Sequence, residues 1–287
     1  MVGFTIAILS GLVVVSRIAV RRRRERDDAG VRLMDTQQRL VDTMDNELQA
    51  AHEAQMGLVP PDPPVHLKYD FVARCVPASH VGGDHYTYRW LDKDRTRLCF
   101  LIADVAGKGM KAAMTVMRFS ELLHYEIQDA RSPSEILTCL SQVLKGRMEK
   151  RQFITAMAAI LDVETGRLTV SCAGHPPMYF YVHADRTITE VDCAGPPLGI
   201  GWPEGYHDET VQVRPGDLAL CCTDGLYEAT DQTRESFGFE RLTRALNTAA
   251  AEPTASGSLD RVYSAVRIYT GNLPQEDDMT AIMIRGL

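Results

Sequence analysis

Hydrophobic and polar positions first set apart the N-terminal end of the chain. Residues 1–20 are almost entirely apolar and lead directly into four consecutive arginines at 21–24. About 20 apolar residues suffice for a helix that crosses a bilayer, and clustered positive charge marks its cytoplasmic side. The pattern predicts a single-pass anchor in the cell membrane, with the rest of the chain in the cytoplasm. A buried core helix is the alternative, and the four arginines disfavour it.

A second pattern, over residues 31–58, is a narrow apolar stripe at helical spacing. It consists of Leu33, Leu40, Met44, Leu48, Ala51 and Leu58. Such a stripe suits a coiled-coil homodimer through residues 31–58, and it suits equally well packing against the chain's own domain. Prolines at 60, 61, 63 and 64 end the helix. We therefore interpret residues 21–64 as a basic juxtamembrane segment, helical linker and hinge, followed by one folded domain at 65–287.

Within residues 65–287, short β-type runs alternate with helical patterns. Strands are predicted at 98–103, 153–161, 168–172, 178–182, 218–222 and 279–284, and helices at 110–127, 133–148, 239–250 and 259–269. The helix at 133–148 begins with a capping signal, Ser132, Pro133 and Glu135. Strand-turn-strand pairs such as 161–168 favour antiparallel sheets with helices packed outside, rather than a regular βαβ alternation.

Composition and charge narrow the class of protein. The 287 residues are 45% hydrophobic, enough to build a core, and the net charge is -7. Because a phosphate backbone requires a basic surface, this charge argues against nucleic-acid binding. The seven cysteines include no C-x-x-C pair, so neither a disulfide framework nor a zinc site is predicted.

Candidate chemistry lies in acidic residues beside glycines or turns, at the ends of the predicted strands. They are Asp84, Asp104, Asp224, Asp277 and Asp278. Small neighbours let the backbone bend so that carboxylates from distant segments converge. Carboxylates with few histidines suit hard cations, so the expected cofactors are two divalent ions, Mn²⁺ or Mg²⁺. Each Asp-Gly pair alone is weak, because most such pairs only form turns.

Taken in order, these acids and their neighbours resemble a known set of motifs. The segments are VGGD at 81–84, ADVAGKG at 103–109, AGHPP at 173–177, GPPLGI at 195–200, TDGL at 223–226 with Glu228 and Ala229, and DDMT at 277–280. They resemble bacterial serine phosphatases of the sporulation stage II protein E and sigma-factor-regulator type, within the metal-dependent protein phosphatases. The resemblance runs from about residue 49 to the C-terminus.

The resemblance implies a fold, an activity and ligands. The fold is an α-β-β-α sandwich of two antiparallel sheets flanked by helices, here preceded by the membrane helix and linker. Asp84 and Asp104, with the Val105 carbonyl, would hold one ion, and Asp224 with Asp277 the other. Asp278 is the alternative to Asp277. The implied substrate is phosphoserine or phosphothreonine on a regulatory protein such as an anti-sigma-factor antagonist.

The expected mechanism is attack on phosphorus by a water that the two ions activate, with Asp84, Asp104 and Asp224 as catalytic residues. His85 and Lys108 are candidate contacts to the leaving group or phosphate. The plainer interpretations are a polar neighbour of the metal site for His85 and a surface lysine for Lys108. A catalytically silent partner-binding module of the same fold is the alternative function, although none of the metal acids is missing.

Overall fold

The structure, a computed structural model, describes residues 2–128, 131–148, 152–200, 202 and 204–287, and the chain forms two compact units, Met1–Ala51 and His52–Leu287. The second unit therefore includes residues 52–64, which the sequence analysis placed in the linker. Helix α1 (Val2–Met56) supplies nearly all of the first unit. In the part of the chain that the structure describes, no helix is long and apolar enough to cross a membrane. The predicted anchor, residues 1–20, falls outside the residues whose side chains are described.

Three of the six apolar side chains predicted to form the stripe are exposed, and Leu48, Ala51 and Leu58 are half-buried. Leu33, Leu40 and Met44 expose 64%, 61% and 58% of their surface. Homodimerisation through residues 31–58 stays a prediction.

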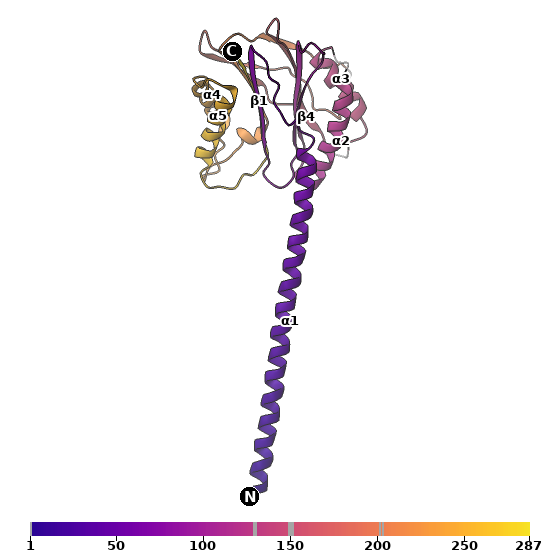
Figure 1. Cartoon of the computed structure of the whole chain (residues 1–287), viewed down its shortest axis with the longest axis vertical. Coiled ribbons are helices and arrows are strands. Elements are labelled where there is room, and N and C mark those ends of the chain that lie inside the picture. The colour runs from indigo at the N-terminus through magenta and orange to yellow at the C-terminus, as the bar shows by residue number, and fades with distance from the viewer. Residues whose placement is uncertain (1, 129–130, 149–151, 201, 203) are drawn as a thin grey trace. The chain divides into compact units, whose positions relative to one another are not determined.

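The second unit contains two five-stranded antiparallel sheets within its described residues (Figure 1). One sheet has the order β1 (Tyr69–Val76), β10 (Met279–Gly286), β9 (Leu218–Cys222), β6 (Met178–Val182) and β7 (Thr187–Val191). The other has the order β2 (Asp84–Trp90), β3 (Arg97–Val105), β4 (Ile154–Asp162), β5 (Arg167–Ala173) and β8 (Glu209–Gln212). All neighbouring pairs are antiparallel.

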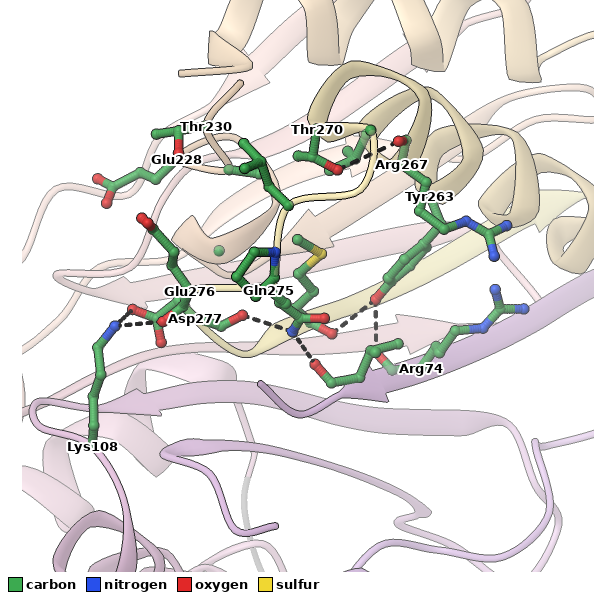
Figure 2. Close-up of a pocket in the computed structure, with 18 residues that line it drawn as sticks. Arg74, Lys108, Glu228, Thr230, Tyr263, Arg267, Thr270, Gln275, Glu276 and Asp277 are labelled. Atoms are coloured by element: carbon green, nitrogen blue, oxygen red, sulfur yellow. Dashed lines mark hydrogen bonds and ion pairs between the residues drawn. The ribbon is translucent and has the colours of Figure 1, made fainter. Parts of the chain in front are cut away.

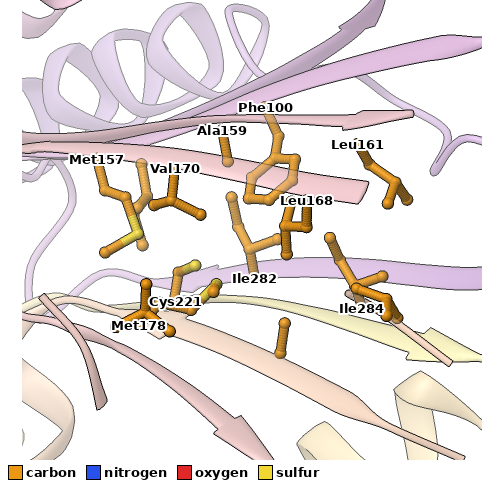
Figure 3. Close-up of a cluster of buried hydrophobic side chains, with 14 of the residues drawn as sticks. Phe100, Met157, Ala159, Leu161, Leu168, Val170, Met178, Cys221, Ile282 and Ile284 are labelled. Atoms are coloured by element: carbon orange, nitrogen blue, oxygen red, sulfur yellow. The ribbon is translucent and has the colours of Figure 1, made fainter. Parts of the chain in front are cut away.

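Helices cover the outer face of each sheet, as Figure 1 shows. Helices α2 (Met110–Glu126) and α3 (Pro133–Leu144) pack on the β4 sheet, and α4 (Gly238–Ala249) and α5 (Ala255–Thr270) on the β1 sheet. Between the sheets lies a third apolar layer that includes Phe100, Met157 and Ile282 (Figure 3). The predicted α-β-β-α sandwich is therefore confirmed.

Most predicted elements exist, with small shifts at their ends. Helix α3 begins where the capping signal indicated, since Ser132 Oγ accepts the Glu135 N–H at 3.3 Å. The strands β1, β2, β7 and β8 were not predicted. Strand β7 is largely exposed and β8 is short, so neither shows a clear apolar run. Strand β2 carries the polar residues Asp84, His85 and Thr87, which hid its β pattern.

Candidate active site

Pairing of β2 with β3 brings the first two acids together. Asp84 is the first residue of β2 and lies directly opposite Asp104 in the antiparallel register. Residues opposite each other in such a pair have Cβ atoms about 5 Å apart. Val105, which ends β3, donates its N–H to the Gly83 carbonyl at 3.0 Å and fixes the approach to Asp84. Asp84 therefore begins a strand instead of following one.

The other acids come from the facing sheet. Asp224 follows β9 and opens the short 3₁₀ helix η1 (Asp224–Leu226), and Asp277 and Asp278 immediately precede β10. Thr223 joins the two groups of acids, because its Oγ1 donates to Asp84 Oδ2 at 2.8 Å across 139 residues of sequence. The structure thus gathers acids from both sheets at one end of the sandwich.

The neighbours Asp277 and Asp278 have different environments. Asp278 is 7% exposed, and its carboxylate accepts the N–H groups of Ala78 at 2.8 Å and Gly83 at 2.7 Å. A Cβ on Gly82 would lie 2.0 Å from Asp278 Oδ2, so only glycine fits there. The Asp277 side chain is 48% exposed. Asp278 therefore serves to hold the loop before Asp84, while Asp277 remains accessible.

Burial and mutual repulsion dominate the electrostatics of the acids. Burial, and then Asp104, raise the pKa of Asp84 well above its usual range. Burial, followed by Asp224 and Asp277, raises the pKa of Asp104 to about 7. The pKa of Asp224 is raised by burial and by Asp277, and that of Glu228 by burial and by Asp224. A bound cation would relieve this repulsion.

This electrostatic arrangement predicts how the stability of the metal-free protein depends on pH. The pKa of Asp104 is about 7 in the folded protein and 3.8 in the reference state, so its contribution to stability is present below pH 3.8 and is lost as pH rises toward 7. Thermal unfolding in EDTA from pH 5 to 8 should show Asp104→Asn gaining stability over wild type as pH rises. The buried histidines His85 and His175, whose lowered pKa values act in the opposite direction, are common to both proteins. A pH-independent difference would contradict the prediction.

Lys108 lies at the exposed edge of the acid cluster. Its Nζ is 2.8 Å from Asp277 Oδ2 and donates to the Glu276 carbonyl at 2.8 Å (Figure 2). The hydrogen bond to Asp277 raises the pKa of Lys108. Lys108 is therefore a fixed positive charge beside Asp277 and not a free surface lysine.

His85 does not line the hollows that contain Asp104, Asp224 and Asp277, and lines a smaller one with Asp84 and Gln55. Its side chain is 2% exposed, and its ring packs edge-on against Phe119 of α2, with centroids 6.5 Å apart. Burial lowers the pKa of His85 to about 4, so the imidazole is neutral. Because successive side chains of a strand point to opposite faces, Asp84 and His85 face different layers. The structure does not bring His85 to the site as a leaving-group contact.

Two hollows adjoin the acids. The first, about 260 Å³, is lined by Asp104, Thr155, Gly174, His175, Pro176, Asp224 and Tyr227. The second, about 480 Å³, reaches Lys108, Gly225, Glu228 and Asp277 and is drawn in Figure 2. Asp104 and Asp224 therefore face one hollow, and Asp277 the other.

The residues around Asp104 fit a hard cation in their chemistry. A Cβ on Gly83 would lie 2.8 Å from the Val105 carbonyl oxygen and 3.3 Å from Asp104 Oδ1, so the missing side chain leaves an oxygen-lined cradle. Among the described residues, no three acidic, histidine or cysteine side chains lie close enough together to bind a metal ion as a group. Mg²⁺ sites commonly combine one or two carboxylates with water, so the Asp104 carboxylate beside the Val105 carbonyl is compatible with such a site.

Several residues around the site were not predicted from the sequence. Thr155 and Tyr227 lie outside the listed motifs, and Thr223, although part of the TDGL motif, shows its role only through its hydrogen bond to Asp84. His175 belongs to the AGHPP motif but had no role predicted for it, and it lines the smaller hollow, with Nδ1 3.3 Å from Thr155 Oγ1. Gln55 pairs its amide with both backbone groups of Gly82, at 2.8 and 3.1 Å. A glutamine near a helix end does not by itself predict a contact with a distant loop.

Comparison with known proteins gives the chain relatives. Phosphoserine phosphatase RsbU of Bacillus subtilis (strain 168) is 28% identical over 183 residues, which are 64% of this chain and 54% of that protein. Phosphoserine phosphatase RsbP of the same organism is 26% identical over 159 residues, 53% of this chain and 38% of that protein. The chain thus spans about half or less of the length of these relatives.

Solved structures share the fold. The SiaA-PP2C domain of Pseudomonas aeruginosa has a TM-score of 0.73 at 23% identity, covering 85% of this chain and 97% of that chain. The catalytic domain of the serine threonine protein phosphatase PstP, in complex with two manganese ions, has a TM-score of 0.53 at 15% identity, covering 77% and 99%. Residues 94–286, more than half of the chain, match the family described as Stage II sporulation protein E. With the resemblance of its motifs confirmed, this protein belongs to the Stage II sporulation protein E (SpoIIE) family.

Proposed function

We propose that this protein is a metal-dependent protein serine/threonine phosphatase that hydrolyses phosphoserine or phosphothreonine on a regulatory protein. The observation that carries the proposal is the convergence of Asp84, Asp104, Asp224 and Asp277 at one end of the sandwich, where burial and proximity raise the pKa values of the first three. Ionised carboxylates this close together repel one another, and bound divalent cations would neutralise that repulsion.

Two divalent ions, Mn²⁺ or Mg²⁺, are the proposed cofactors. Asp84, Asp104 and the Val105 carbonyl would hold one, and Asp224 and Asp277 the other. Asp278 is assigned a supporting role, because the backbone N–H groups of Ala78 and Gly83 already occupy its carboxylate. When bound, such ions supply an activated water and neutralise charge on the phosphoryl oxygens.

The chain's own residues position these groups. Thr223 fixes the orientation of the Asp84 carboxylate by donating to Oδ2, and the Val105 N–H holds Gly83 close to β3. Lys108 brings a positive charge beside Asp277, where it can attract phosphoryl oxygens. The smaller hollow, which Asp104, Asp224, Thr155 and Tyr227 help to line, offers space for the phosphoryl group.

The substrate class follows from the relatives. RsbU and RsbP are named phosphoserine phosphatases, and they match 64% and 53% of this chain. We therefore propose that the substrate is a phosphorylated regulatory protein such as an anti-sigma-factor antagonist.

The experiment that tests the proposal is hydrolysis of p-nitrophenyl phosphate by the full chain with Mn²⁺, Mg²⁺ or EDTA. We expect turnover with at least one metal and none in EDTA, because the acids alone supply no nucleophile. A folded protein that binds Mn²⁺ without turning over this substrate or a phosphoserine peptide would instead support the silent binding module.

Attachment to the cell membrane through residues 1–20, with the catalytic unit in the cytoplasm, is the proposed localisation. The apolar run followed by four arginines supports it. The full chain should sediment with the membrane fraction and resist extraction by high salt, and recovery in the supernatant would oppose the assignment.

A further inference from the structure

The larger hollow extends from the acids along helix α5. It has a volume of about 480 Å³, within the usual range for ligand pockets. In Figure 2, Lys108, Glu228 and Asp277 lie at one side, and Tyr263, Arg267 and Arg74 lie toward the other. The hollow is therefore continuous with the acid cluster at only one of its ends.

The walls of this hollow are held by hydrogen bonds before anything binds. The Tyr263 hydroxyl donates to the carbonyls of Arg74 at 3.2 Å and Met279 at 3.0 Å. Gln275 Nε2 donates to the carbonyls of Val76 and Asp277, both at 2.7 Å. Figure 2 shows these contacts joining β1, α5 and the loop before β10. A preformed cavity loses less conformational entropy when a ligand binds.

The lining combines apolar surface with one arginine that has no carboxylate partner among the described residues. Its apolar residues are Val76, Ala229, Val266, Leu273, Pro274 and Met279. Arg74 already pairs with Asp260 at 2.7 Å and lies over the Tyr263 ring. Arg267 is exposed, and among the interactions of the described residues its guanidinium has one hydrogen bond, to Ser264 Oγ at 3.2 Å, and no carboxylate partner. The far end of the hollow can therefore accept a carboxylate.

We propose that this hollow binds the segment of the phosphorylated partner that flanks its phosphoserine, with an acidic side chain of that segment paired to Arg267. The proposal rests on the proposed phosphatase function and specifies its substrate. A carboxylate directly beside the phosphoserine would meet Glu228 and Asp277, which repel it. The favoured acidic position is thus several residues away, and apolar side chains occupy the space between.

The test uses the full chain and a set of phosphoserine nonapeptides. Each has an alanine and glycine background with a single Glu moved through every position, and phosphate release gives kcat/KM. Dividing by kcat/KM for p-nitrophenyl phosphate normalises each variant for metal loading. We expect one distal Glu position to raise this ratio about threefold to fivefold, the size of an exposed ion pair. Arg267→Gln should remove the gain.

Arg244→Gln is the matched control, since Arg244 is an exposed arginine of α4 that does not line this hollow. It should retain the gain. Fluorescence anisotropy with labelled phosphonate versions of the same peptides gives binding without turnover. If the chain hydrolyses nothing, the phosphatase proposal fails while anisotropy still decides whether Arg267 reads a distal Glu. A Glu preference that is absent, or that survives Arg267→Gln, would overturn the inference.

Discussion

Replacing Asp224 by asparagine should lower kcat/KM for p-nitrophenyl phosphate by roughly 10²- to 10³-fold, because a direct ligand matters at least as much as the outer groups of a metal site. Without metal, the same variant should be more stable than wild type at pH 7.5. Burial and Asp277 raise the pKa of Asp224, so its ionised form opposes folding there. Thermal unfolding with EDTA and with Mn²⁺ measures both effects, and Mn²⁺ should stabilise the variant less than wild type.

Glu240→Gln provides the control for this experiment. Glu240 is an exposed acid of α4 that pairs with Arg244 in a surface ion pair, and its loss should change neither activity nor the response to Mn²⁺. If Mn²⁺ stabilised Asp224→Asn as much as wild type and the variant kept full turnover, Asp224 would not be a metal ligand.

The second large effect is a contrast between two adjacent aspartates. Asp278→Ala should destabilise the protein by about 2–4 kcal/mol, because the buried N–H of Gly83 and the part-buried N–H of Ala78 lose their acceptor. Asp277→Ala should leave stability nearly unchanged, since its ion pair with Lys108 is largely exposed, but should sharply reduce metal-dependent activity.

Urea unfolding in EDTA and activity as a function of Mn²⁺ concentration separate the two roles. High Mn²⁺ should partly restore Asp277→Ala, whose remaining ligands are in place. Asp278→Asn, which keeps one acceptor oxygen, should lose less stability than Asp278→Ala. Equal losses of stability at positions 277 and 278 would contradict the different roles of the two side chains.

Much of the fold could be predicted from local pattern. Strands β3, β4, β9 and β10 are buried on both faces and read as continuous apolar runs, and α3 is marked by its Ser132 cap. Strand β2 could not be predicted in this way, because its polar residues serve the site instead of a core face. Its position follows from pairing with β3, which is a tertiary interaction.

In the site, too, some features follow from local sequence and others only from tertiary contacts. Strand ends and glycine turns identify the acids in the sequence, but nothing local separates Asp277 from Asp278. Their difference arises from a hydrogen bond between Asp278 and Gly83, which lie 195 residues apart. The direction in which His85 points likewise depends on which sheet face packs against α2.

By itself, the sequence determined most of the elements, the family and the set of carboxylates, because periodicity, turn chemistry and motif order are local properties of the chain. Only the tertiary structure decided that Asp277 is accessible while Asp278 is buried, and that Lys108 is held beside Asp277. It also decided that a hollow adjoins the acids and is lined by Arg267, which has no carboxylate partner among the described residues. These features come from strand register and from packing between distant segments, where a shift of one residue would turn each side chain to the opposite face.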